Sequence, residues 1–244
     1  MRSSGFRPMR IDAHSRGGDA GESGLLLLQA WLSPAFPVGG YSYSHGLEYA
    51  VEAGLLPDRA ALQNWIEGIL LFGAGRSDAL VIREVHRAVT AGEFARCDEI
   101  AAFAAALRGT SELALEASAQ GAAFLKALTA GWPELAAAEP LRQWKRTVYP
   151  AGFGAAAAVA GIDARLAVLS YLHAFCANLV SAALRLMPIG QSDGLACLAR
   201  LSTTLPSLAD ALELVPFDDI GSAALMVDVC SMRHETQYTR LFRS

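Results

Sequence analysis

The chain has 244 residues, with 20 Lys and Arg against 24 Asp and Glu, so its formal net charge is −4. Hydrophobic residues make up 53% and charged residues 18%, which excludes a chain that is disordered throughout, because disorder needs low hydrophobicity and high charge. The negative charge argues against a nucleic-acid binder that works by neutralising phosphates. The length suffices for a domain with a core of its own.

Two kinds of site are missing from the sequence. Lys126 and Lys145 are the only lysines and neither follows a glycine, so the chain has no GxxxxGK[ST] phosphate-binding loop. The four cysteines show no CxxC spacing and predict no zinc or disulfide framework; we expect small buried side chains in a reducing compartment. The leucine run Leu25–Leu28 has no signal-peptide cleavage site after it, so we expect a cytoplasmic protein.

Helical periodicity covers most of the chain. Residues 1–23 are rich in Ser, Gly and Arg and predict a disordered N-terminal tail. From residue 24 onward apolar residues recur at helical spacing. The predicted helices are Asp58–Phe72, Ser77–Ala91, Glu93–Leu107, Ser111–Thr129, Gly154–Ala160, Asp163–Met187 and Ser192–Thr203.

Local signals place the ends of these helices. Asp163 and Ser192 are predicted N-caps, Gly92 is a C-terminal stop, and the prolines of Gly131–Pro150 predict an extended connection. No run alternates as a strand does. The sequence therefore predicts an all-α, single bundle-like domain over residues 24–230, with a central buried helix and a flexible C-terminal tail over residues 231–244.

The run Leu166–Leu184 carries no formal charge. At 1.5 Å per residue it would nearly cross a bilayer core of roughly 30 Å. His173 and Asn178 lie inside it and an arginine flanks each end, so we interpret it as the central buried helix, with a membrane anchor as the alternative.

Two catalytic motifs are only partly matched. Gly152–Ala157 fits the dinucleotide pattern GxGxxA, but no strand precedes it and no acidic residue follows at the required distance; we interpret it as a helix-packing site of small residues. Ser42, His45 and Glu48 would provide a nucleophile, a base and an orienting carboxylate. These three residues are too close in sequence to form a relay with independent geometry, because His45 and Glu48 are expected on one helix face. A small-molecule hydrolase using Ser42 and His45 is the alternative function.

The C-terminal end has the composition of an interaction surface. Met232–Ser244 contains Tyr238, Phe242 and several arginines, and Tyr and Arg are enriched among interface hot spots. In the alternative interpretation Tyr238 and Phe242 pack back onto the core of their own chain.

Three segments resemble the urease accessory protein UreF family. Leu32–Glu48 (LSPAFPVGGYSYSHGLE) resembles its N-terminal signature, Asn178–Gln191 (NLVSAALRLMPIGQ) its central helix and the following turn, and His234–Ser244 (HETQYTRLFRS) its terminal tail. The resemblance extends from about Leu25 to Ser244.

This resemblance implies an all-α homodimer without catalytic activity. Proteins of this kind join the accessory protein UreD and the GTPase UreG, and the assembly inserts nickel into the urease apoenzyme. The implied chain has no cofactor or metal ligand of its own, because nickel and GTP are handled by its partners; neither nucleic acid nor membrane is expected as a partner.

The resemblance also implies which residues meet the partners. The tail would dock on the UreD-like protein and become ordered as it binds, through Arg233, His234, Glu235, Gln237, Tyr238, Arg240, Leu241, Phe242 and Arg243. The motif loop would be a rigid element that turns into a helix near Ser44, formed by Pro34, Pro37, Gly39, Gly40, Tyr41, Ser42, His45 and Glu48. An architectural turn without partner contact is the alternative for this loop.

Overall fold

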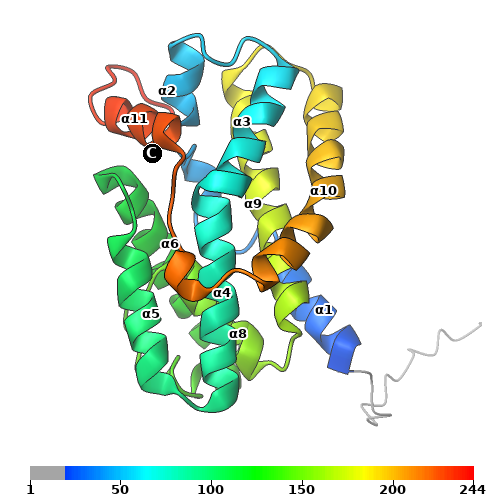
Figure 1. The fold of residues 1–244 in the computed structure, drawn as a ribbon, viewed down its shortest axis with the longest axis vertical. Coiled ribbons are helices and arrows are strands. Elements are labelled where there is room, and N and C mark those ends of the chain that lie inside the picture. The colour runs from blue at the N-terminus through cyan, green and yellow to red at the C-terminus, as the bar shows by residue number, and fades with distance from the viewer. Residues whose placement is uncertain (1–19) are drawn as a thin grey trace, which may run out of the picture.

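The computed structural model describes residues 20–244, and that part of the chain is helical without a strand (Figure 1). The all-α prediction is therefore confirmed. The elements in chain order are α1 (Ala20–Trp31), η1 (Gly40–Ser42), α2 (Leu47–Glu52), α3 (Arg59–Phe72), α4 (Ala74–Ala91), α5 (Phe94–Ala106), α6 (Ser111–Gly131), α7 (Pro133–Ala136), α8 (Tyr149–Val159), α9 (Ala164–Leu186), α10 (Gln191–Glu213), η2 (Phe217–Asp219) and α11 (Leu225–His234).

Side-chain caps account for several helix starts. The carboxylate of Asp58 accepts the amide hydrogen of Ala61 at 2.8 Å, and that of Asp163 accepts the amide hydrogen of Leu166 at 2.9 Å. Gly92 ends α4 in the left-handed conformation, with a φ of 74°. The predicted helices over residues 58–129 and the predicted cap at Asp163 agree with the structure because these signals are local.

The predicted helix boundaries near Pro133, Pro150 and Pro206 are wrong, because these prolines lie inside helices. The expected extended connection contains the short helix α7, and α8 begins at Tyr149, five residues early, since Pro150 fits the first turn of a helix. The predicted cap at Ser192 is wrong: α10 starts after Gly190, whose amide donates to Asp193. It then continues through Pro206 to Glu213, ten residues beyond the prediction.

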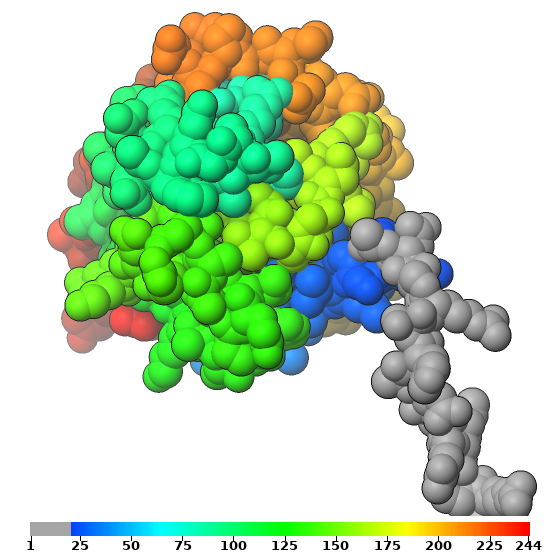
Figure 2. All heavy atoms as spheres, turned by 90° about the horizontal axis from the view of Figure 1, so that it is seen from below, coloured from blue at the N-terminus to red at the C-terminus, as the bar shows by residue number. Residues whose placement is uncertain are grey.

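The most extensive contact between two helices in the described part of the chain is that of α8 with α4. Residues 149–157 of α8 are all buried. A Cβ atom placed on Gly154 would lie 2.8 Å from the carbonyl oxygen of Ile82 on α4, so the two backbones approach as closely as glycine allows. The Gly152–Ala157 segment is thus a helix-packing site, as predicted. In the space-filling view α1, in blue, lies against the yellow-green α8–α9 connection (Figure 2), and there Gly24 faces Ile162.

Among the described residues, α9 is the one helix long and apolar enough to span a membrane by length and composition. Half of its apolar stretch is buried inside the fold, where it packs against α10, α4, α2 and α8. That burial fits the predicted central helix.

The structure differs from the prediction at both ends. Residues 20–23 of the predicted N-terminal tail belong to α1, and residues 1–19 lie outside the described part. The C-terminal segment, expected to be flexible, instead folds back between α2 and α6 (Figure 1). Helix α11 crosses the expected boundary at residue 231, and Phe242 is only 4% exposed.

Candidate docking site around the C-terminal segment

The three segments that carry the family resemblance meet in space. The guanidinium of Arg185, in the α9 segment, lies 4.2 Å above the ring of Phe242 in the C-terminal segment. A Cβ atom on Gly40, in the N-terminal segment, would lie 3.2 Å from the side-chain amide of Asn178 on α9. Glu48 of the N-terminal segment accepts the amide hydrogen of Phe242 at 2.9 Å. One site therefore contains all three segments.

The loop before α2 owes its shape to left-handed residues. Gly39 has a φ of 74°, His45 of 57° and Gly46 of 77°. A side chain at Gly46 would also collide with α11, because its Cβ atom would lie 3.0 Å from the carbonyl oxygen of Val227. The expected helix start near Ser44 is wrong: α2 begins at Leu47, since two consecutive left-handed residues are incompatible with an α-helix.

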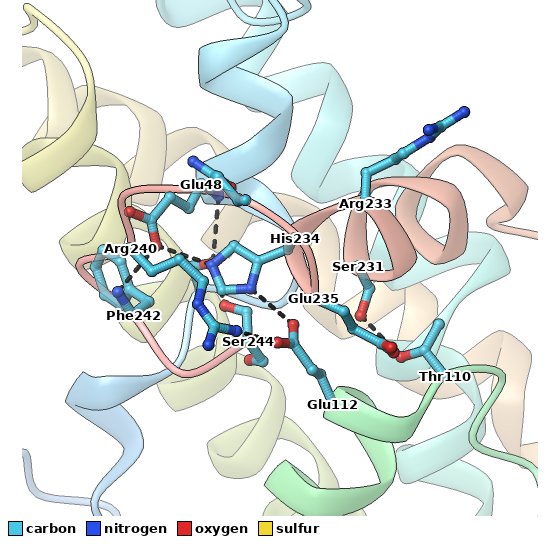
Figure 3. A network of polar contacts seen from close by, with 12 residues as sticks. Glu48, Thr110, Glu112, Ser231, Arg233, His234, Glu235, Arg240, Phe242 and Ser244 are labelled. Carbon is cyan, nitrogen blue, oxygen red and sulfur yellow. Dashed lines mark hydrogen bonds and ion pairs between the residues drawn. The ribbon is translucent and has the colours of Figure 1, made fainter.

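Glu48 holds the C-terminal segment through its carboxylate (Figure 3). Its Oε1 atom accepts the amide hydrogen of Leu241 at 2.6 Å, and its Oε2 atom accepts that of Phe242 at 2.9 Å. Hydrogen bonds to a charged acceptor are about twice as strong as neutral ones. Glu48 therefore accepts the two backbone hydrogen bonds that water would accept if this segment were detached.

His234, the last residue of α11, is fully buried between two carboxylates (Figure 3). Its Nε2 atom lies 3.0 Å from Oε2 of Glu48, and its Nδ1 atom lies 2.7 Å from Oε2 of Glu112. Each ring nitrogen is therefore within hydrogen-bonding distance of a carboxylate oxygen, and the imidazole links α2 to α6.

Glu112 lies in the first turn of α6, where the helix dipole favours a negative charge. Its second oxygen accepts a hydrogen bond from Arg240 of the C-terminal segment at 2.8 Å. Glu112 thus contacts both His234 and Arg240. Next to them, Thr110 caps α6 and its hydroxyl lies 2.8 Å from that of Ser231 on α11.

Ser244 is completely buried. Its main-chain oxygen accepts from the amide of Ser44 at 2.9 Å and from the Ser44 hydroxyl. Its own hydroxyl donates to Oε2 of Glu116 at 2.8 Å. These contacts join the C-terminal segment to the loop before α2 and to α6.

Glu116 is a second, partly buried carboxylate of α6, one turn after Glu112. Its Oε2 atom lies 3.5 Å from Nδ1 of His45. Burial raises the pKa of Glu116, but His45, the Ser244 hydroxyl and Arg108 outweigh burial, so that the pKa of this carboxyl lies below its ordinary value. Glu116 is therefore held in its ionised form.

A small cavity of about 30 Å³ with polar and apolar walls lies beside Glu116. One wall is Asp78, whose carboxylate accepts from Arg108 at 2.6 Å and from the Tyr171 hydroxyl at 2.8 Å. Burial, followed by the charge of Asp78, raises the pKa of Tyr171 well above its ordinary value, so this hydroxyl stays a donor. The cavity thus lies between Glu116, which the Ser244 hydroxyl contacts, and the ion pair of Asp78 on α4 with Arg108 in the α5–α6 turn.

The remaining predicted tail residues lie nearer the surface. Glu235 accepts from Ser111 at 2.5 Å, Gln237 donates to Glu52, and the guanidinium of Arg243 lies 5.8 Å from the Tyr43 ring. Six predicted contact residues are exposed: Arg233, Glu235, Tyr238, Arg240, Leu241 and Arg243. The alternative in which Tyr238 and Phe242 both pack on the core holds for Phe242 alone, because Tyr238 is fully exposed.

The motif loop also separates into exposed and buried residues. Pro34, Pro37 and Tyr41 are exposed, and the carbonyl of Ser42 accepts from the amide of Arg243 at 2.8 Å. The loop therefore presents an aromatic side chain outward and supports the C-terminal segment with its backbone.

The geometry does not assemble the hydrolase relay. The carboxylate of Glu48 contacts Leu241, Phe242 and His234 rather than His45. The carboxylate next to His45 belongs to Glu116. No hydrogen bond joins Ser42 to His45 in the part of the chain that the structure describes. Within residues 20–244 no three His, Cys, Asp or Glu side chains are arranged to hold a metal ion.

Glu112, Glu116 and Asp78 were not predicted as site residues. Each lies on an amphipathic helix, where an acidic residue ordinarily indicates a solvent face. The sequence feature that could have identified two of them is their spacing, because Glu112 and Glu116 are one turn apart on α6, between apolar neighbours. Their partners His234, Arg240 and Ser244 are more than 120 positions away.

Comparison with known proteins agrees with the resemblance. The family model described as UreF matches residues 56–202. A urease accessory protein UreF of Granulibacter bethesdensis is 46% identical over 235 residues, 96% of this chain and 100% of the relative. Those of Methylorubrum populi and Magnetococcus marinus are 47% and 41% identical and cover 90% and 91% of this chain, and 98% and 99% of their own lengths. The chain belongs to the UreF family of urease accessory proteins.

Proposed function

We propose that this chain is a non-catalytic scaffold for urease maturation by GTP-dependent nickel insertion, bridging UreD-like and UreG-like partners beside the urease apoenzyme. Membership of the UreF family supports this role. Nickel and GTP would be handled by the partners. We further propose a cytoplasmic homodimer, an expectation that rests on the family resemblance and that light scattering of the purified chain tests directly.

The observation that carries the proposal is that the C-terminal segment has buried residues that anchor it and exposed apolar residues that a partner could contact. Its buried members, His234, Phe242 and Ser244, anchor the segment to α2 and α6. Tyr238 and Leu241 point outward, fully and 62% exposed. An aromatic and an aliphatic side chain on an anchored backbone form a preorganised docking surface, because the entropy of ordering the segment is already offset within the chain.

Docking is tested with a variant that leaves the anchors in place. Tyr238→Ala combined with Leu241→Ala removes exposed apolar surface, so the helical circular dichroism and the unfolding transition are expected to stay unchanged. Co-purification with the UreD-like protein is expected to fall at least tenfold. Leu195→Ala with Leu214→Ala, which truncates one exposed leucine on α10 and one just after its end, is the matched control and should co-purify normally.

Undiminished capture of the UreD-like protein by the double tail variant would contradict the docking assignment. The scaffold role has a separate test: urease activity and urease nickel content are compared in cells with and without this chain. Equal nickel content in the two strains would refute that role.

A further inference from the structure

We propose that the cavity beside Glu116 binds ordered water, which accepts a hydrogen bond from Arg108 and donates one to Glu116. The lining residues that carry this inference are His45, Asp78, Arg108, Glu116, Tyr149 and Tyr171. A bound water at this place goes beyond the scaffold role, because it concerns how the chain holds its own C-terminal segment.

Arg108 has a buried donor that lacks an acceptor. Its side chain is 10% exposed, and its Nη2 atom donates to Oδ1 of Asp78 at 2.6 Å. The Nε atom is buried as well, but it has no hydrogen-bond partner among residues 20–244. Because an unsatisfied buried donor of a charged group is costly, an acceptor is expected beside this atom.

Glu116 lines the same cavity and has acceptor capacity left. Its Oε1 atom accepts from the Gln120 amide at 3.1 Å and its Oε2 atom from the Ser244 hydroxyl at 2.8 Å, whereas an ionised carboxylate offers about four lone-pair positions. Burial raises the pKa of Glu116, and the charge of Arg108 is among the influences that lower it. Within the described residues, however, Arg108 forms its ion pair with Asp78. The two opposite charges are thus neighbours without direct contact, an arrangement that a bridging water fits.

The size of the cavity and the groups around it favour water over other ligands. Its volume of about 30 Å³ exceeds the roughly 10–15 Å³ that one water needs. Arg108 needs an acceptor and Glu116 can take a further donor, so the ligand must both accept and donate, which excludes a metal cation. Burial raises the pKa of the Tyr149 hydroxyl, so this group is a second donor. The Nδ1 atom of His45 lies 3.5 Å from Oε2 of Glu116, beyond the ordinary hydrogen-bond range of about 2.7–3.2 Å, and is a further polar neighbour.

The bound water connects two parts of the fold. On one side, Glu116 holds the Ser244 hydroxyl of the C-terminal segment. On the other side, Arg108 is paired with Asp78 on α4. Water between Glu116 and Arg108 completes a hydrogen-bonded path from the C-terminal segment to α4.

A crystal structure of the full chain that resolves ordered water tests this directly. An electron-density peak is expected in the cavity, within about 3.2 Å of both Nε of Arg108 and an oxygen of Glu116. An empty cavity, or a direct hydrogen bond from this Nε atom to a protein group, would overturn the proposal.

Oxygen-17 relaxation dispersion gives a second measurement in solution, because it counts the waters that stay bound inside a protein. Ala117 is buried on α6 and lines the cavity, so Ala117→Val is expected to lower the count by at least one water. Ala130→Val, at an exposed position of the same helix, is the matched control and should keep the wild-type count. Equal counts for the wild type and Ala117→Val would refute the site. If Ala117→Val does not fold, the crystal structure of the wild type decides.

Discussion

His234 and Glu48 are 186 positions apart in the sequence and 3.0 Å apart in the structure, Nε2 to Oε2. The same carboxylate accepts two backbone amides of the C-terminal segment. The N-terminal signature of the family thus binds its terminal tail directly. Two predictions concern this site, and two more concern the packing of α4 against its neighbours.

Replacing Glu48 by Gln removes the charge opposite His234 while keeping the size of the side chain. Glu48 also accepts two backbone amides, and a hydrogen bond to a charged group contributes about 1.5–3 kcal/mol, so we expect a loss of about that size in the free energy of unfolding, measured by urea titration. Glu52→Gln, on the same helix but at an exposed contact to Gln237, should change it by less than about 1 kcal/mol. Equal effects of the two variants would contradict the anchoring role.

Acidification should weaken the fold through Glu116. Its folded-state pKa lies below the ordinary value of 4.5, so its contribution is fully present above that value and is lost as the pH falls through the folded-state pKa. The difference in unfolding free energy between the wild type and Glu116→Gln should therefore shrink as the pH falls below 4.5. Parallel stability curves over the whole acid range would exclude this explanation.

The approach of α8 to α4 predicts opposite effects for two glycine substitutions. Gly154→Ala places a Cβ atom 2.8 Å from the carbonyl oxygen of Ile82, and overpacking of this kind costs about 1–3 kcal/mol. Gly68→Ala on α3 meets no atom within 4 Å and should stabilise by about 0.5–1 kcal/mol, since alanine is the better helix former. Thermal unfolding of both variants measures the difference, and a stabilising Gly154→Ala would disprove the close approach.

Two arginines one turn apart on α4 should differ in how much their replacement lowers the free energy of unfolding. Arg83 is buried and its guanidinium donates to the carbonyls of Leu212 and Val215 at the end of α10. Arg83→Met leaves buried carbonyls without donors, which costs about 1–3 kcal/mol each. Arg87, half exposed and paired with Glu84 and Glu213, should lose less than about 1 kcal/mol as Arg87→Met. Chemical denaturation distinguishes the two, and indistinguishable losses would refute the capping role of Arg83.

Local patterns in the amino-acid order were enough for most helices. The apolar stripe of α3, the Asp58 and Asp163 caps and the stop at Gly92 act within one or two turns, so they can be read from neighbouring residues. The family resemblance was equally readable, because its motifs are continuous segments. The ten residues of α10 beyond Thr203 were missed, because packing against α9, α3 and α4 retains a helix through Pro206 that propensity alone would end.

The site depended on contacts that no local pattern contains. Glu112 and Glu116 have the spacing of an ordinary helix face, and their roles appear only when the fold brings His234, Arg240 and Ser244 to them. The segment expected to be free is anchored for the same reason: its partners are buried carboxylates from two distant helices. Burial makes an unpaired charge costly, and which charges become buried is a property of the packed helices rather than of any stretch of residues.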